Sequence, residues 1–221
     1  MKLKDNENLV VLGIFLGLTG LFSALVLAVV SHFTARPIAE AAAKREDAAL
    51  RQVLPVFDND IKETKVAVKS PAGWQVQFMI AGNNGKIAGY AATVSNPAGY
   101  AGKITMLAGL NTDGTIRALL VTEHNETPGL GAEICKREFR KTVFNLTEPQ
   151  PDGLAPNKYL DQFNGRKVPS GGWSITKDGG DAVYATGATV TGRAVVKSAS
   201  EITAAFIKNR EKINAAFRRD K

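Results

Sequence analysis

An uncharged apolar stretch near the start of the chain constrains its fold more than any other feature. It runs from Leu9 to Ser31, 23 residues consisting mainly of Leu, Val, Ile, Phe, Gly and Ala. A helix of about 20 such residues crosses the hydrocarbon core of a bilayer, whereas the apolar region of a cleaved signal peptide has only about 7 to 15. A helix buried in a protein core would rarely be apolar on every face. We therefore predict one retained transmembrane helix over 9–31.

The charges around this helix do not indicate its orientation. Two lysines and two acidic residues precede it, and three basic residues follow it: Lys2, Lys4, Asp5, Glu7, Arg36, Lys44 and Arg45. The excess of basic residues that marks a cytoplasmic flank therefore favours neither side. Ile38 to Leu54 is rich in Ala, Glu, Lys and Arg, with Pro37 suited to the first turn of a new helix and Pro55 at its end. We predict a helical stalk over 32–55.

The next part of the chain has the alternating pattern of antiparallel strands. Apolar residues alternate with glutamines over 74–80, and Asn84-Gly85 separates this run from 86–94. Asn-Gly pairs favour the tight turn of a hairpin. By the same reasoning, Asp113-Gly114 joins strands over 103–110 and 115–124. The sequence thus predicts two hairpins, and with the flanking helices an α+β fold.

Composition excludes several classes of function. Cys135 is the single cysteine and there are two histidines, so we expect no disulfide and no metal site, and Cys135 is expected to be a small buried residue. Residues 208–221 contribute six basic and two acidic side chains, or +4, to a net charge of +7. This basic end is either a solvated helix end or a contact for anionic lipid or an acidic partner. No basic patch is interleaved with aromatic residues, so we expect no nucleic acid partner.

A stiff loop follows the second hairpin, with the sequence Glu126-Thr127-Pro128-Gly129-Leu130-Gly131. Pro-Gly favours a turn, and the last glycine lets the backbone approach a ligand closely. Ile134 stands where a dinucleotide-binding fingerprint would have its third glycine, so we exclude that motif. We predict a helix over 132–144. The composition of 147–180 then predicts mostly loop.

A threonine-rich turn near the C-terminus precedes an apolar helical pattern. Thr186-Gly187-Ala188-Thr189 consists of small residues and hydroxyls, and the pattern that follows is Val195, Val196, Ala199, Ile202 and Phe206. The first N–H groups of such a helix have no partner within it and lie at the positive end of its dipole, so a phosphate is stabilised there. The alternative is that Thr189 or Thr191 merely caps the helix.

The turn resembles the Ser/Thr-Gly-Ala-Thr flavinylation motif of membrane-bound, ion-pumping redox complexes, in which the last threonine carries FMN through a phosphoester. Together with the transmembrane stretch and the loop at 126–131, it makes nearly the whole chain similar to the G subunit of the Rnf (Rsx) electron-transport complex. Gly99 to Ile104 fits the Gly-Tyr-Gly-Gly segment of that family, with Ala101 replacing a glycine. The homologous C subunit of the sodium-pumping NADH:quinone oxidoreductase shares the loop and the turn and is the alternative.

The resemblance implies a set of residues around the flavin. It places the FMN phosphate on Thr189, in a turn shaped by Thr186, Gly187, Ala188 and Thr191. The same comparison places Glu126, Thr127, Leu130 and Gly131 at the border of the isoalloxazine ring, with Tyr100 and Lys177 packing on the ring or donating to it. The family has an acidic residue three positions before the turn. Here that residue is Val183, and Asp181 is the acidic residue that could replace it.

The implied function is that of an electron-transfer subunit of an ion-translocating oxidoreductase. The flavin holds one or two electrons, so no catalytic triad is expected, and the sites for ferredoxin and NAD would lie on other subunits. The implied partners are the membrane and iron–sulfur subunits of the complex, a flavin transferase and the lipid bilayer. The competing class is a cofactor-free, membrane-anchored assembly or interaction module.

The resemblance also implies the location and the division of the chain. It places the protein in the bacterial cytoplasmic (inner) membrane as a single-pass protein, with its soluble domain on the periplasmic side. The expected ranges are a cytoplasmic segment over 1–8, the transmembrane helix over 9–31, the stalk over 32–55, an antiparallel-sheet FMN-binding domain over 56–208 and a basic tail over 209–221.

Overall fold

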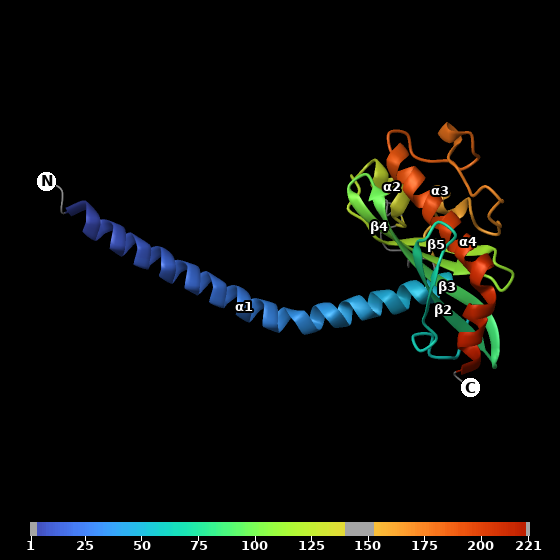
Figure 1. Cartoon of the computed structure of the whole chain (residues 1–221), viewed down its shortest axis with the longest axis horizontal. Coiled ribbons are helices and arrows are strands. Elements are labelled where there is room, and N and C mark those ends of the chain that lie inside the picture. Colours follow the sequence, from blue (N-terminus) through green and yellow to red (C-terminus); the bar gives the residue numbers. More distant parts are fainter. Residues whose placement is uncertain (1–3, 140–152, 220–221) are drawn as a thin grey trace, which may run out of the picture. The chain divides into compact units, whose positions relative to one another are not determined.

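The structure, a computed structural model, describes residues 4–139 and 153–219 (Figure 1). The chain divides into two compact units, 1–47 and 48–221, which we describe separately. The first unit is most of a long helix. The second contains the end of that helix, an antiparallel sheet and the remaining helices.

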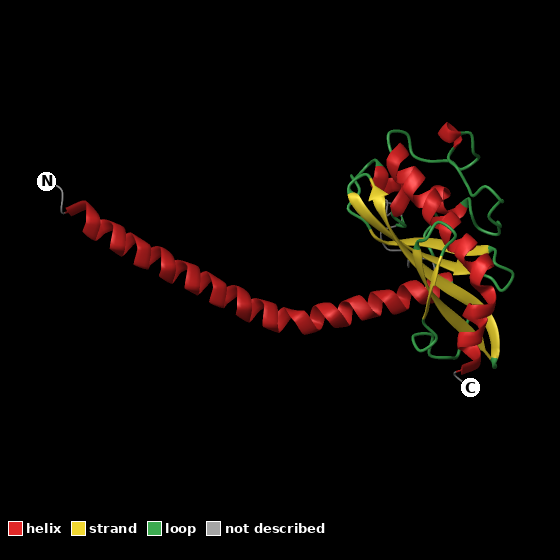
Figure 2. Ribbon diagram, in the orientation of Figure 1, coloured by secondary structure: helices red, strands yellow, loops and turns green. Residues whose placement is uncertain are grey.

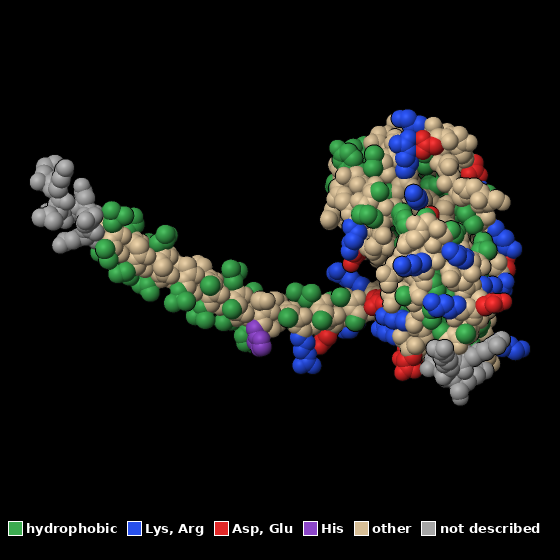
Figure 3. All heavy atoms as spheres, viewed as in Figure 1, with side chains coloured by type: hydrophobic (Ala, Val, Ile, Leu, Met, Phe, Trp, Pro, Cys, Tyr) green, Lys and Arg blue, Asp and Glu red, His purple; other side chains and the backbone are tan. Residues whose placement is uncertain are grey.

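The long helix α1 (Lys4–Val53) has 50 residues. We expected a new helix to begin at Pro37, but α1 continues through this residue. Pro37 has no N–H group for the carbonyl of Phe33, so one internal hydrogen bond is missing. Side chains from Leu9 to Ala48 are exposed, and hydrophobic ones follow the first part of the helix in Figure 3. Within the described ranges, α1 is the one helix that is long and apolar enough to cross a membrane.

Five antiparallel strands form one sheet in the order in which they occur in the chain (Figure 2). They are β1 (Val66–Lys69), β2 (Gln75–Asn83), β3 (Lys86–Gly99), β4 (Gly102–Leu110) and β5 (Ile116–Glu123). Both predicted hairpins are confirmed: β2 pairs with β3 and β4 with β5. Asn84 and Gly85 have the positive φ angles, 50° and 73°, that a tight hairpin turn requires. We did not predict β1, which has four residues of which only Val68 is buried.

The two faces of the sheet are covered by opposite ends of the chain. Helix α4 (Thr189–Arg219) packs on one face, where Phe206 contacts the rings of Phe78 and Tyr90. The end of α1 packs on the other face, where Leu50 and Val53 join a smaller apolar cluster. Because alternate residues of a strand face opposite sides, each central strand contributes to both clusters. The domain is therefore a sheet between two helical layers, which confirms the α+β fold.

The predicted helix over 132–144 is wrong in its extent. Helix α2 spans only Gly131–Cys135, and Lys136 is extended, with φ −80° and ψ 140°. The described residues 136–139 are not helical, and 140–144 lie outside the described residues. The segment expected to be mostly loop, 147–180, contains α3 (Lys158–Asp161) and a 3-10 turn, η1 (Thr176–Asp178), in its described part.

Helix α4 extends to Arg219, into the range 209–221 that we expected to be a basic tail. Asn209 departs from helical geometry, with φ −117°, and its side chain donates to the carbonyls of Ala205 and Lys69. Beyond this kink the helix extends to Arg219, and Ile213 is completely buried in the main core. Residues 209–219 are therefore an ordered part of the domain.

Candidate functional site

The threonine turn leads directly into α4, as predicted. Gly187 has φ +83°, and the N–H group of Ala188 donates to the carbonyl of Ala185 at 3.0 Å. The first bond of the helix runs from the N–H group of Gly192 to the carbonyl of Ala188 at 2.9 Å. The N–H groups of residues 189–191 therefore have no acceptor within the helix.

Neither threonine caps the helix. Ala188 occupies the capping position, since its carbonyl accepts the first helical bond. Thr189 is the first helical residue and is half-buried, and within the described ranges its hydroxyl makes no hydrogen bond. Thr191 is 1% exposed, and its hydroxyl donates to Oε2 of Glu126 at 2.7 Å. The alternative that Thr189 or Thr191 caps the helix is therefore wrong, and the Thr191 side chain faces the protein interior.

Glu126 joins three segments of the chain. Its side chain is buried, and Oε1 accepts the N–H group of Ala101 in the turn between β3 and β4, at 3.2 Å. Its own N–H group donates to Nδ1 of His124 at 3.2 Å. A Cβ atom at Gly131 would collide with the Glu126 carboxylate and would lie 2.6 Å from Oγ1 of Thr191. The carboxylate therefore points into the protein, and glycine at position 131 makes room for it.

Three exposed apolar side chains lie on the segments that meet here. Tyr100, in the turn between β3 and β4, is 72% exposed, Leu130 is 44% exposed and Val190 is 43% exposed. A Cβ atom at Gly187 would lie 3.1 Å from Cδ2 of Leu130, so the loop packs directly against the threonine turn. Thr127 and Thr186 are also exposed. The structure thus brings the loop, the threonine turn and the Tyr100 turn to one end of the domain, where α2 lies beside the start of α4 (Figure 1).

Lys177 is less closely connected to this group. It lies on η1, where its neighbour Asp178 accepts two hydrogen bonds from Arg193 of α4, at 2.6 and 2.7 Å. The Arg193 guanidinium lowers the pKa of Asp178. This ion pair holds η1 against α4. Lys177 itself is exposed, and among the described residues it makes no hydrogen bond to the threonine turn.

Asp181, the acidic residue that could replace the usual one at position 183, is committed elsewhere. Its carboxylate forms an ion pair with Arg166. Val183 is 52% exposed, and its backbone exchanges two hydrogen bonds with the Gln162 amide, at 2.7 and 2.8 Å. The segment before the turn is therefore held by Gln162 and Arg166.

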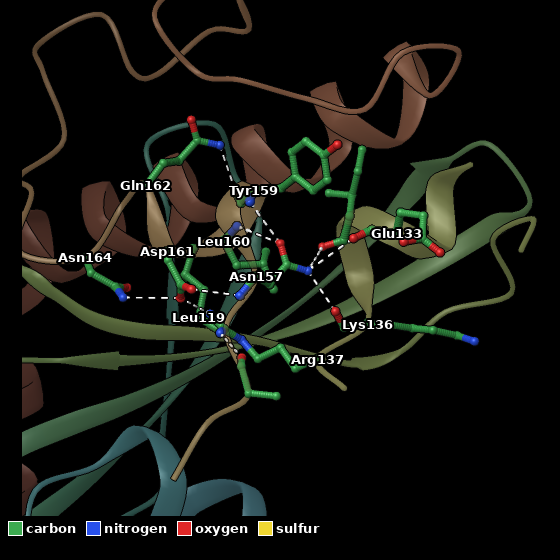
Figure 4. A network of polar contacts seen from close by, with 12 residues as sticks. Leu119, Glu133, Lys136, Arg137, Asn157, Tyr159, Leu160, Asp161, Gln162 and Asn164 are labelled. Carbon is green, nitrogen blue, oxygen red and sulfur yellow. Dashed lines mark hydrogen bonds and ion pairs between the residues drawn. The ribbon is translucent and has the colours of Figure 1, made fainter. Parts of the chain in front are cut away.

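A polar network that we did not predict fixes the position of α2 (Figure 4). The Asn157 amide donates to the carbonyls of Glu133, Ile134 and Lys136. The carbonyl oxygen of the same side chain caps α3 by accepting two of its backbone N–H groups. An asparagine before a short helix is a typical capping signal, which is how the sequence indicates this residue. The loop at 126–131 leads directly into α2, which these hydrogen bonds connect to α3.

Burial of this region also determines the pKa of the thiol of the single cysteine. Cys135, the last residue of α2, is 1% exposed. Burial, with a smaller contribution from the nearby Glu126 carboxylate, raises the pKa of its thiol to about 12. Cys135 is therefore a packing residue, as we expected from the sequence.

Comparison with known proteins identifies the class of this domain. The family model described as "FMN-binding domain" matches residues 99–203, which include the Tyr100 turn, the loop, the threonine turn and the first half of α4. The chain therefore contains an FMN-binding domain.

Similar proteins then identify the family. The chain is 33% identical over 194 residues to the G subunit of the ion-translocating oxidoreductase complex of Photorhabdus laumondii, with 84% of each chain covered. It is 34% identical over 194 residues to the G subunit from Salmonella typhi, covering 84% of this chain and 85% of the relative. It is 31% identical over 211 residues to the G subunit from Pseudomonas aeruginosa, covering 91% of this chain and 90% of the relative. The chain belongs to the family of G subunits of ion-translocating oxidoreductase complexes.

Proposed function

We propose that this protein is the membrane-anchored flavoprotein subunit of an ion-translocating ferredoxin:NAD oxidoreductase (Rnf) complex, and that its FMN is joined to Thr189 by a phosphoester. We infer the attachment site from the accessibility and the hydrogen bonding of the Thr189 hydroxyl. It makes no hydrogen bond within the described ranges, it is partly accessible, and it lies on the first residue of a long helix. The relatives are G subunits, which favours this assignment over the C-subunit alternative.

The residues present fit an FMN phosphate. The N–H groups of residues 189–191 point out of the helix start, and the helix dipole favours negative charge there. A phosphodiester oxygen on Thr189 would therefore find donors without any change in the backbone. Val190, exposed beside Thr189, leaves this surface open to the cofactor.

The neighbouring apolar surface fits a flavin ring. Leu130 packs against Gly187 and remains 44% exposed, and Tyr100 is largely exposed on the adjacent turn. An aromatic side chain and an aliphatic one give a planar ring apolar contacts on the protein side. When bound, FMN supplies reversible one- and two-electron transfer, while the chain supplies its position and polarity. We assign the ring contact to Tyr100, Leu130 and Thr127, and a more distant electrostatic role to Lys177.

The membrane arrangement follows from α1 and from the family. We propose that α1 anchors the chain in the bacterial inner membrane with the domain on the periplasmic side. There a flavin transferase would attach the FMN, and the other membrane and iron–sulfur subunits of the complex would exchange electrons with it. The chain's own residues hold the cofactor and perform no acid–base or nucleophilic step on a substrate.

The test is a spectrum and a peptide map of the full-length protein, produced with its flavin transferase and then denatured. We expect a flavin spectrum that remains with the polypeptide, and a peptide containing Thr189 whose mass is increased by FMN less one water. The control is the same expression without the transferase. A colourless polypeptide from cells that flavinylate another substrate would instead support the cofactor-free assembly module.

A further inference from the structure

We propose that Glu126 is a positioning residue, which joins the Tyr100 turn to the start of α4 and keeps the Thr191 hydroxyl buried, so that of the two threonines in the first turn of α4 only Thr189 presents its hydroxyl for attachment. This inference rests on the proposed function. It replaces the role expected for Glu126 from the family resemblance, a contact with the isoalloxazine ring. The contacts of both carboxylate oxygens lie inside the protein.

Both oxygens of the Glu126 carboxylate accept hydrogen bonds inside the protein. Oε1 accepts the N–H group of Ala101, 25 residues away in sequence, and Oε2 accepts the hydroxyl of Thr191, 65 residues away. The side chain is 5% exposed. A buried carboxylate requires hydrogen-bond donors, and bonds to a charged acceptor are stronger than neutral ones. The Asn96 amide of β3 also donates to Ala194 and Ser198 of α4. Glu126 adds a direct link from the turn between β3 and β4 to the first turn of α4.

The backbone around the Glu126 carboxylate leaves room for it through two glycines. A Cβ atom at Gly99 would collide with the carbonyl of Gly102 and would lie 2.7 Å from Oε1 of Glu126, and one at Gly131 would collide with Oε2. Glycine at both positions allows two backbone segments to approach the carboxylate from different directions. A residue that merely lined a cofactor pocket would not need to be enclosed in this way.

The two threonines in the first turn of α4 project in different directions. Successive helical residues are about 100° apart around the axis, so Thr189 and Thr191 project roughly 200° apart. Thr191 faces inward, is 1% exposed and donates its hydroxyl proton to Glu126. With that face turned toward Glu126, Thr189 lies on the accessible side. The hydrogen bond thereby sets the rotation of the first turn of α4 about its axis.

The first test requires no flavin. Backbone hydrogen exchange is measured by mass spectrometry on full-length, flavin-free protein, comparing wild type with Glu126→Gln and with the matched control Glu133→Gln, an exposed carboxylate on α2. We expect Glu126→Gln to speed exchange at Ala101 and at Gly192 and Arg193, the first residues of α4 whose N–H groups bond within the helix. Glu133→Gln should leave exchange in both peptides unchanged. Acceleration in neither peptide, or in only one, overturns the proposal. If Glu126→Gln does not fold, Thr191→Val is compared with wild type in the same peptides.

The second test measures the rate of flavin attachment by the transferase. We expect Glu126→Gln and Thr191→Val each to slow attachment about tenfold, with any product still on Thr189. Glu126→Gln replaces the charged acceptor by a neutral amide, and Thr191→Val removes the donor. Thr191→Ser keeps the hydroxyl and should restore the rate. The double variant should be no slower than the slower single variant, because both changes act on the same contact.

These measurements separate this proposal from the proposed function. Loss of flavin in Glu126→Gln with unchanged hydrogen exchange would show that Glu126 contacts the cofactor and does not position the backbone. Equal rates for Thr191→Ser and Thr191→Val would also overturn the proposal. If wild type takes up no flavin, the proposed function fails and the hydrogen-exchange comparison still decides the role of Glu126.

Discussion

The guanidinium of Arg137 and the carboxylate of Asp161 are joined by a 2.6 Å ion pair beside the end of α2. The Arg137 side chain is 3% exposed, and it also donates to the carbonyls of Leu119 at 2.9 Å and Ala155 at 2.7 Å. One side chain therefore connects the segment after α2 with β5 and with the turn containing α3 (Figure 4). The position of the loop at 126–131 depends on this connection.

We predict that Arg137→Met lowers the free energy of unfolding by about 2–4 kcal/mol, because two carbonyls lose a donor and the Asp161 carboxylate loses its charged partner. The measurement is denaturant unfolding of the full-length protein in detergent. Arg117→Met, at an exposed position on β5, is the control and should change stability by less than about 0.5 kcal/mol. Equal stabilities of the two variants would show that the Arg137 network is not structural.

For the attachment site, we predict that Thr189→Val abolishes covalent FMN while Thr186→Val and Thr191→Val retain it on Thr189, with slower attachment in Thr191→Val. Valine keeps the shape of threonine and removes the nucleophilic oxygen. Because Ala188 and not Thr189 occupies the capping position, Thr189→Val should unfold at nearly the same temperature as wild type. Peptide mass mapping decides the site, and an adduct retained in Thr189→Val would overturn the assignment.

Leu130→Ala should leave FMN attached but change its absorption spectrum or reduction potential. Leu130 is 44% exposed and packs over Gly187, so its loss alters the surroundings of the ring without affecting the Thr189 hydroxyl. The measurement is a redox titration of the purified variant, with Val56→Ala, an exposed residue outside the site, as control. A folded Leu130→Ala protein without flavin would contradict the separation of roles between the loop and the threonine turn.

The thiol of Cys135 should resist alkylation in the native protein at pH 8. With its pKa raised to about 12, only about one molecule in ten thousand carries the thiolate at that pH, and the side chain is buried. Iodoacetamide labelling followed by intact mass measures the reaction, and the same protein in denaturant is the control and should be labelled. Rapid labelling of the native protein would mean that α2 opens readily.

We also predict that α1 remains in the mature protein. Its apolar part is longer than a signal peptide requires, and the helix continues without a break into the stalk at Arg36 and beyond. Intact mass of protein purified from membranes measures this. A chain beginning near Ala35 would contradict it. A reporter fused after Lys221 tests the side of the membrane, and activity only in the cytoplasm would contradict a periplasmic domain.

Local patterns in the sequence determined much of this protein. An uncharged apolar stretch indicated α1, turn pairs such as Asn84-Gly85 indicated the hairpins, and the Thr186–Thr189 turn indicated the start of α4. In each case the physical cause acts between residues close in sequence: backbone dihedral preference, strand alternation, or the hydrophobicity of one continuous segment. These features could be predicted because they need no partner from elsewhere in the chain.

Only the tertiary structure decided which side chains face one another. The pattern over 132–144 favoured a helix, but at Lys136 the chain is already extended, and Arg137 bonds to β5 and α3. Likewise, the buried hydrogen bond between Glu126 and Thr191 joins residues 65 positions apart. From the local sequence alone, Glu126 reads as an ordinary loop carboxylate and Thr191 as a helix cap, and nothing indicates that they meet. Such contacts arise only when the sheet brings distant segments together, because their free energy depends on burial and on donors that the neighbouring sequence does not contain.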